Sequence, residues 1–125
     1  MTKLILATSW KVKEEGNQRF IQLYDKDGNE VDGDKARWEG DFDCSYNQLI
    51  SLEGAPREVN DDFYCSHNKL TSLKGAPREV NGNFYCSDNK LTNSNIKLVG
   101  SLEEIEKKIQ LEKAKETVLF GVVNK

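Results

Sequence analysis

The sequence has few histidines and cysteines, no excess of positive charge and no long apolar segment. It has one histidine, three cysteines and a net charge of −3. A strongly basic nucleic-acid binder is therefore excluded. No apolar stretch is long enough to cross a membrane, and the apolar run near the N-terminus is too short for an export signal. We therefore expect a cytoplasmic protein with reduced cysteines.

Motifs for catalysis and cofactor binding are lacking as well. The sequence has no phosphate-binding glycine loop, no paired-carboxylate signature and no base-stacking motif. Asp25, Asp27 and Asn29 are spaced like the first ligands of a calcium loop. However, Glu30 stands where that loop needs glycine, and Ala36 stands where it needs a bidentate glutamate. We expect a turn here, and a protein that is not an enzyme and needs no cofactor or metal.

The sequence does contain a segment that is repeated three times, between residues 36 and 98. Cys44, Cys65 and Cys86 are spaced 21 residues apart. Phenylalanine stands two positions before each cysteine, serine follows it, and asparagine and leucine come at fixed offsets. The connector Gly-Ala-Pro-Arg-Glu-Val occurs at both 54–59 and 75–80. A fixed period of this length indicates a solenoid, because one such unit cannot bury its apolar side without a neighbour.

The chain of 125 residues is expected to form a single domain with three regions. Residues 1–35 should be a β-rich N-terminal cap, residues 36–98 the three repeats, and residues 99–125 a C-terminal cap. Strands of the first region are predicted at 4–12, 19–24 and 30–31. Caps are expected because the open ends of a solenoid must be covered.

The last region has the pattern of a helix over 101–117. Ser101 can serve as its N-cap, with Glu104 completing a capping box. The apolar face would contain Leu102, Ile105 and Ile109, and the outer face the pairs Glu103–Lys107 and Glu104–Lys108. The run 118–123 is rich in β-branched residues, so we expect a closing strand there.

Written out, the unit is Val-x-x-x-Phe-x-Cys-Ser-x-Asn-x-Leu-Thr-Ser-Leu-x-Gly-Ala-Pro. It resembles the leucine-rich repeat, whose core is L-x-x-L-x-L-x-x-N-x-L. The family's positions in the middle unit are taken by Phe63, Cys65, Asn68, Leu70 and Leu73. The short form with a proline in the return segment is similar to repeats of bacterial effectors and of small bacterial and phage proteins. Two departures are noted: a third residue between Val59 and Phe63, which a wider turn would accommodate, and a loss of pattern at 93–96.

Period-two alternation assigns the repeat side chains to the two faces of a short parallel sheet. Phenylalanine, cysteine and leucine are expected inside, and the asparagines should bind backbone groups at the bend. These structural positions are Phe42, Cys44, Asn47, Leu49, Phe63, Cys65, Asn68, Leu70, Phe84, Cys86, Asn89 and Leu91. The cysteines are interpreted as core residues, since structural zinc needs four ligands. A redox or metal site is the alternative.

The outward positions of the unit are candidates for recognition. Ser45, Ser66 and Ser87 are constant there, whereas other outward positions vary from unit to unit. The candidate partner-binding residues are Asp43, Tyr46, Tyr64, His67, Tyr85 and Asp88. Tyrosine is favoured at interfaces, because it adds a large contact area with little loss of entropy. The alternative is that the tyrosines only stabilise the sheet by stacking.

These observations predict an α+β protein, a leucine-rich-repeat solenoid of about three coils between the two caps. Its expected function is that of a non-catalytic protein–protein interaction module with a protein partner. The resemblance to phage repeat proteins adds the expectation of an inhibitor that occludes a host protein in the bacterial cytoplasm. Three strands about 4.8 Å apart expose on the order of 200 Å², below the roughly 800 Å² per partner of a specific interface. The caps or a second copy must therefore contribute.

Two other classes of function stay open. One is a structural protein that forms homo-oligomers. The other is an acidic nucleic-acid mimic that blocks a nuclease, with carboxylates at phosphate-like spacing. The residues for such mimicry would be Asp41, Asp43, Asp61 and Asp62.

Overall fold

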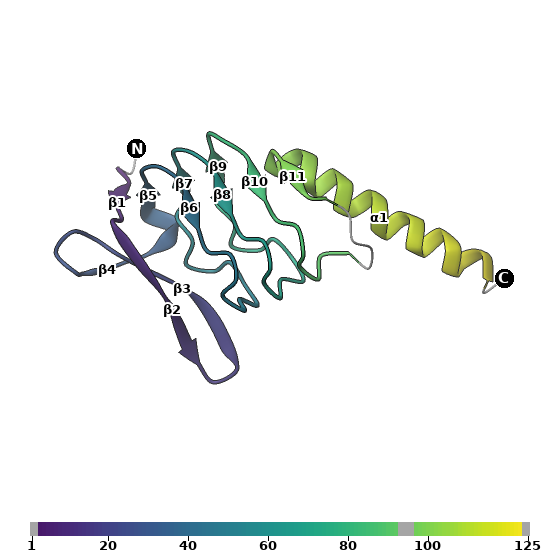
Figure 1. Ribbon diagram of the computed structural model, residues 1–125, viewed down its shortest axis with the longest axis horizontal. Helices are drawn as coiled ribbons and strands as arrows, with labels where there is room; N and C mark the ends of the chain where they lie inside the picture. Colours follow the sequence, from purple (N-terminus) through teal and green to yellow (C-terminus); the bar gives the residue numbers. More distant parts are fainter. Residues whose placement is uncertain (1–2, 93–96, 124–125) are drawn as a thin grey trace.

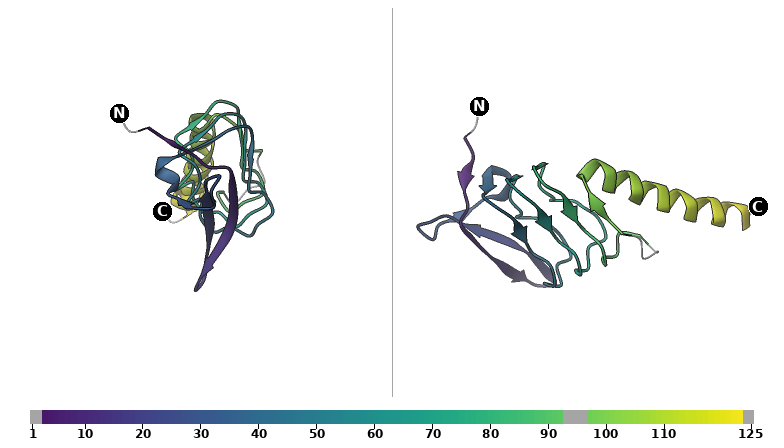
Figure 2. Two further views of the ribbon diagram at one scale, coloured as in Figure 1. Left: turned by 90° about the vertical axis from the view of Figure 1, so that its left-hand side faces the viewer. Right: turned by 45° about the horizontal axis from the view of Figure 1, so that its top comes forward.

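The computed structural model shows an α+β arrangement of small sheets and one α-helix (Figure 1). It describes residues 3–92 and 97–123, with residues 116–123 described by their backbone alone. The sequence departure at 93–96 lies outside the described residues. The described repeat strands pair in parallel, and the repeats occupy the middle of the molecule between a β-hairpin and the helix (Figures 1 and 2).

Each repeat contributes two short strands, one to each of two sheets. The first sheet has the order β1-β5-β7-β9, with every neighbouring pair parallel. Its strands are β1 (Ile5–Leu6), β5 (Ala36–Trp38), β7 (Glu58–Val59) and β9 (Glu79–Val80). The second sheet has the order β6-β8-β10-β11. Its strands are β6 (Phe42–Asp43), β8 (Phe63–Tyr64), β10 (Phe84–Tyr85) and β11 (Val99–Gly100), of which β11 is antiparallel to β10.

The sequence analysis expected one parallel sheet in the repeats, and this is corrected here: β5, β7 and β9 form an additional sheet. The chain turns a corner between Val59 and Phe63, and the same corner recurs one repeat later. The extra residue found in the sequence lies in this corner. Val59 therefore does not continue into β8. It belongs to a separate strand, β7, which pairs with the equivalent strands of the neighbouring units. At the far edge of the first sheet, the one partner of β9 among the described strands is β7.

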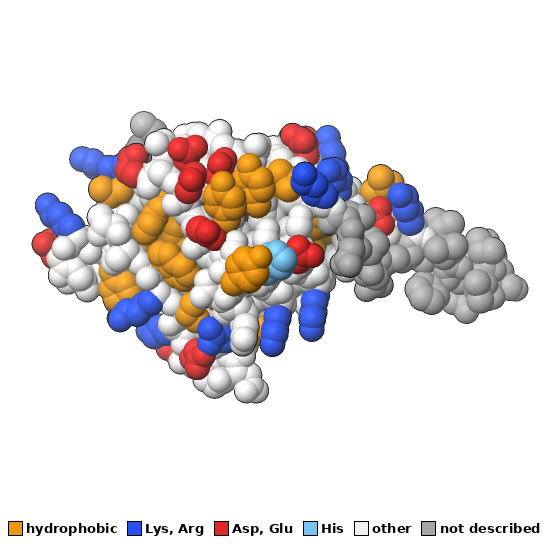
Figure 3. Space-filling view, in the orientation of Figure 1, with side chains coloured by type: hydrophobic (Ala, Val, Ile, Leu, Met, Phe, Trp, Pro, Cys, Tyr) orange, Lys and Arg blue, Asp and Glu red, His pale blue; other side chains and the backbone are white. Residues whose placement is uncertain are grey.

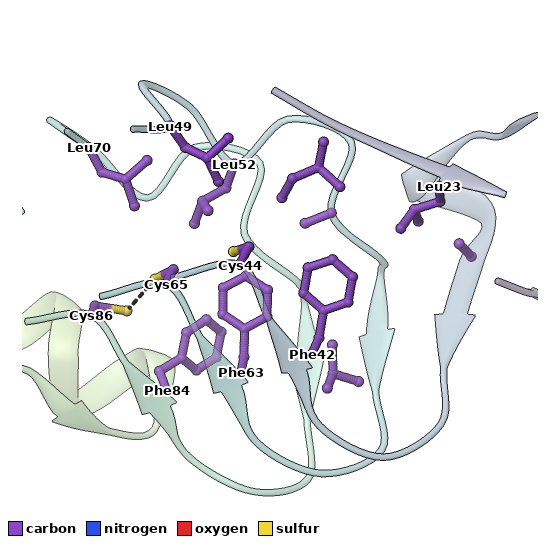
Figure 4. Packing of buried hydrophobic residues seen from close by; sticks show 14 of the residues in the cluster. Leu23, Phe42, Cys44, Leu49, Leu52, Phe63, Cys65, Leu70, Phe84 and Cys86 are labelled. Atoms are coloured by element: carbon purple, nitrogen blue, oxygen red, sulfur yellow. Dashed lines mark hydrogen bonds between the residues drawn. The ribbon is translucent and has the colours of Figure 1, made fainter. Parts of the chain in front are cut away.

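The interior is filled by columns of identical side chains, one from each unit (Figure 4). Phe42 pairs in register with Phe63, and Phe63 with Phe84. The ring centroids are 5.7 Å and 5.3 Å apart in the two pairs. The cysteines and the leucines of the units are buried beside them, as the alternation predicts. Trp10 and Trp38 close the first end of this column, with ring centroids 5.3 Å and 4.9 Å from that of Phe42.

The N-terminal region is a hairpin with a short third strand. It contains β2 (Ser9–Glu15), β3 (Gln18–Tyr24) and β4 (Glu30–Val31), all antiparallel. The strand predicted over 4–12 is divided, because Ala7 N–H bonds Arg37 of the first sheet while Thr8 N–H bonds Tyr24 of the hairpin. The predicted turn after Tyr24 is confirmed: the Asp25 carboxylate accepts the Asp27 and Asn29 N–H groups at 2.9 Å each. A 3₁₀ turn, η1 (Gly33–Lys35), leads into the repeats.

The hairpin packs directly onto the first repeat. The Ile21 N–H donates to the Glu53 carbonyl at 3.1 Å, and the Arg19 guanidinium donates twice to the Asn47 carbonyl, at 3.1 and 2.9 Å. Gly54 makes this approach feasible. Its φ is +90°, and a Cβ there would lie 1.7 Å from the Ile21 carbonyl oxygen. Only glycine combines that backbone angle with that closeness.

The predicted C-terminal helix forms and is longer than expected. Helix α1 spans Leu102–Val123. The Ser101 hydroxyl accepts the Glu104 N–H and donates to its carboxylate, both at 3.1 Å. The Glu103–Lys107 pair also forms, at 3.2 Å, whereas Glu104 turns to Ser101 instead of Lys108. Ile105 is buried against the repeats, and Leu102 and Ile109 are packed beside it.

The strand predicted over 118–123 is wrong, since α1 continues through these residues. A strand needs a neighbouring edge to satisfy its backbone, whereas a helix satisfies its own. The β-branched residues cost at most about 0.7 kcal/mol each in a helix relative to alanine, and no turn sequence stops the helix before them. The helix points away from the sheets (Figure 1). In the described residues, no helix has the length and apolar character needed to span a membrane.

Candidate partner-binding face

Six side chains predicted for recognition lie along one side of the second sheet and the turns that follow its strands. We call this set the outer face: Asp43, Tyr46, Tyr64, His67, Tyr85 and Asp88. Orange and red side chains lie next to one another on this side of the molecule (Figure 3). The six form two columns. The strand column consists of Asp43, Tyr64 and Tyr85, and the turn column of Tyr46, His67 and Asp88. The ring contacts lie within each column.

The strand column contains a stacked pair of tyrosines. The rings of Tyr64 and Tyr85 are parallel within 7°, with centroids 4.6 Å apart. Both side chains are half-buried. The Tyr64 hydroxyl donates to the Asp62 carboxylate at 3.3 Å. Partial burial raises the pKa of Tyr64 above its ordinary value, and the Asp62 carboxylate raises it further. Tyr64 therefore remains a neutral hydrogen-bond donor at physiological pH.

The turn column combines an aromatic pair with a contact between a histidine and a carboxylate. The Tyr46 ring stacks on the His67 ring at a centroid distance of 4.3 Å. His67 Nε2 lies 3.2 Å from an Asp88 carboxylate oxygen. Tyr46 is nevertheless 74% exposed, the largest exposure among the large hydrophobic side chains described. An aromatic side chain in that position contributes little to the core and leaves most of its surface accessible.

The backbone of the turn column was not anticipated from the sequence. Tyr46, His67 and Asp88 have φ values of 60°, 56° and 58°, in the left-handed region. Histidine and aspartate occur in this region more often than most residues, so His67 and Asp88 could have indicated a left-handed turn from the sequence. Tyrosine has no such preference, and its strain costs on the order of 1 kcal/mol.

The acidic residues near the face have a structural role that sequence analysis missed. The Asp41 carboxylate accepts the Asp62 N–H at 2.9 Å, and the Asp62 carboxylate accepts the Asn83 N–H at 2.8 Å. These three residues are 21 positions apart and form a ladder at the corner of each unit. Carboxylate oxygens of Asp41, Asp61 and Asp62 lie within 4.8 Å of one another. Part of the negative charge is thus used to join the units.

The asparagine column behaves as predicted and holds the bend together. The Asn68 side-chain oxygen accepts the Asn47 and Leu49 N–H groups at 3.0 and 2.9 Å. Its amide nitrogen donates to the Cys44 and Cys65 carbonyls at 3.1 and 3.0 Å. This column fixes the turn from which Tyr46 and His67 project.

The cysteines face the opposite way and are fully buried. None forms a disulfide, and Cys65 Sγ lies 3.1 Å from Cys86 Sγ. Burial raises the pKa of the Cys44 thiol well above its usual range. For Cys65, the hydrogen bond to Cys86 is the main cause of a raised pKa, followed by burial. Both effects suppress the thiolate, which is the reactive form.

We expect all three cysteines to resist a thiol reagent such as DTNB at pH 8 in the folded protein and to react together on unfolding. The reason is burial combined with raised pKa values for Cys44 and Cys65. The measurement is the time course of labelling with and without urea. Ser72→Cys, which places a thiol at an exposed position, serves as the control and should label at once. Rapid labelling of Cys65 in the native protein would reopen the redox interpretation.

A groove on another side of the repeats has a different composition. It has a volume of about 450 Å³ and is lined by the Gly-Ala-Pro-Arg connectors and by η1, with both charge signs present. Arg57, Arg78 and Lys74 share it with Asp32, Asp34 and Glu53. None of the outer-face residues lines it, so its arginines are suitable for control substitutions.

Comparison of the chain with protein-family models, with curated proteins and with solved structures found no match.

Proposed function

We propose that this protein is a non-catalytic protein-interaction module whose outer face binds a protein partner. The repeats would form a short solenoid of the leucine-rich-repeat type, with the hairpin and α1 as its caps. The main observation in support is the pair of aromatic stacks at outward positions, of which Tyr46 is 74% exposed. Stacked, pre-ordered aromatic rings lose little entropy on binding, which is characteristic of interface anchors.

The outer face alone is too small for a specific interface. The two columns are three residues long, so the partner must also contact neighbouring parts such as the hairpin or α1 to reach the roughly 800 Å² of a specific interface. The resemblance to phage repeat proteins supports a role in which such contact occludes a bacterial host protein. The constant interior and the varied outer positions fit a scaffold that presents a chosen set of side chains.

A structural, self-assembling role has one observation in its favour. β1 and β9 stand at opposite edges of one parallel sheet, and Ile5 and Leu6 of β1 are 46% and 36% exposed. Open edges can pair with another chain. Light scattering during size exclusion separates this alternative from the main proposal, under which the isolated protein is a monomer.

Replacing both Tyr64 and Tyr85 with serine is expected to weaken partner binding by about 2 kcal/mol or more, roughly 30-fold. The fold should persist, with a lost cross-strand contact of about 0.2–1 kcal/mol. The partner is captured from a bacterial lysate on immobilised protein, and its affinity for each variant is measured by calorimetry.

The matched control is the double variant Arg57→Ala and Arg78→Ala, which changes exposed side chains in the groove away from the outer face. It should bind the partner like the unchanged protein. Equal affinity of the tyrosine variant and the unchanged protein would place the interface elsewhere and contradict this proposal.

A further inference from the structure

In the strand column, the second and third units each have a tyrosine, whereas the first unit has Asp43 and no aromatic ring. Tyr85 covers one side of the Tyr64 ring. On the other side, the residue in register with Tyr64 is Asp43, whose side chain is short and exposed. Within the described residues, Tyr64 has no ring contact besides Tyr85. The first unit therefore leaves one face of the Tyr64 ring without an aromatic neighbour and places a carboxylate beside it.

The surroundings of that ring carry negative charge without a matching cation. Asp41, Asp61 and Asp62 cluster at the corners just before β6 and β8. Among the described side chains, no lysine or arginine nitrogen comes within 4.0 Å of these carboxylates or of Asp43. One oxygen of Asp41 and one of Asp43 accept backbone N–H groups, and their second oxygens have no hydrogen bond in the described part of the chain.

We propose that the outer face takes an arginine side chain of the protein partner, with its guanidinium plane stacked on the open side of Tyr64. The N–H groups of that arginine would donate to Asp43 and to the carboxylates of the neighbouring corner. This inference rests on the proposed function, because it names what the partner presents to the face. The guanidinium would occupy the level at which the other two units have a tyrosine.

The chemistry selects arginine over other groups. Its guanidinium is flat, stacks on aromatic rings and offers five donors in a fixed fork, whereas the lysine ammonium is compact and strongly hydrated. Charge-assisted hydrogen bonds to carboxylates are about twice as strong as neutral ones. A phosphate-bearing partner would be repelled by the same carboxylates, so the charge favours a basic protein segment over nucleic acid.

The probe is a capped peptide of sequence Gly-Arg-Gly-Arg-Gly, titrated into isotope-labelled protein in the presence of EDTA and followed by NMR. We expect saturable shifts at the Tyr64 ring and at Asp43. The peptide with lysine in place of arginine should bind about threefold more weakly, and the one with citrulline, which lacks the charge, about tenfold more weakly.

Variants separate stacking from charge. Tyr64→Phe keeps the ring and should keep binding, whereas Tyr64→Leu should lose about tenfold in affinity. Asp43→Asn should weaken binding as well. Asp27→Asn, in the exposed turn between β3 and β4, should not. Backbone spectra verify that each variant is folded.

Two results would overturn the inference. One is the absence of saturable shifts on the outer face. The other is equal binding of the arginine and lysine peptides together with an unaffected Tyr64→Leu variant, which would show attraction by charge alone. Neither result decides the proposed function, which is judged separately by the partner affinity of the tyrosine double variant.

Discussion

Asn68→Ala is expected to lower the free energy of unfolding by about 3 kcal/mol. Asn68 is 8% exposed, and its side-chain oxygen is the acceptor for the Asn47 and Leu49 N–H groups. A buried donor without a partner costs about 1–3 kcal/mol, and alanine leaves two of them. The carbonyls of Cys44 and Cys65 lose less, because each also accepts a bond from another asparagine of the column.

Urea unfolding followed by circular dichroism measures this effect. The matched control is Asn60→Ala, in the corner of the same unit. Asn60 is exposed and accepts one bond from Asn81 at 3.3 Å, so its loss should change stability by no more than about 0.5 kcal/mol. Similar effects of the two substitutions would mean that the asparagine column does not hold the bend.

Gly54→Ala should destabilise the protein by about 3 kcal/mol, and its main structural effect should be at the hairpin. The φ of +90° costs an L-residue about 1–2 kcal/mol. The added methyl group would also lie 1.7 Å from the Ile21 carbonyl oxygen, so β3 must move away. Overpacking of this kind costs about 1–3 kcal/mol. The bond from Ile21 N–H to the Glu53 carbonyl would then be strained or broken.

Gly16→Ala isolates the backbone part of this cost. Gly16 has a φ of +61° at the tip of the hairpin, and a Cβ there meets nothing within 4 Å. We expect a loss of about 1 kcal/mol from φ alone. NMR spectra of Gly54→Ala should show displaced signals through β3, whereas those of Gly16→Ala should change only near the turn. Equal stability losses would refute the close approach of hairpin and repeat.

The repeat positions could be predicted because they follow from two simple periods. The spacing of 21 residues puts equivalent side chains at the same level of successive units, and the period of two along a strand decides which face each takes. Phe63 and Cys65 are therefore buried and Tyr64 is not. The helix start at Ser101 was also predictable, since a capping box depends on residues close in sequence.

The remaining features depend on contacts between distant segments, so no local pattern revealed them. The strands β7 and β9 form because Val59 and Val80 have partners in neighbouring units, not because of their own sequence. The requirement for Gly54 comes from Ile21 on the hairpin. In 118–123, strand propensity was a misleading guide because it measures fit to a sheet, whereas these residues continue helix α1.

The left-handed backbone of the turn column limits what can be read from its side chains. Variation at Tyr46, His67 and Asp88 suggested freedom at these positions, yet all three residues share one backbone conformation. In the first two units, the asparagine of the following unit accepts backbone N–H groups just after this turn position. The side chains vary while the main chain does not.

The identical register of successive units allows the chain to be lengthened by internal duplication. Phe63 already has a phenylalanine on each side, so a second copy of residues 57–77 inserted after Pro77 would meet the same neighbours as the original. Such an insertion would leave the junctions at the hairpin and at α1 unchanged. Each such duplication would lengthen the chain by 21 residues and would add one tyrosine to the strand column of the outer face.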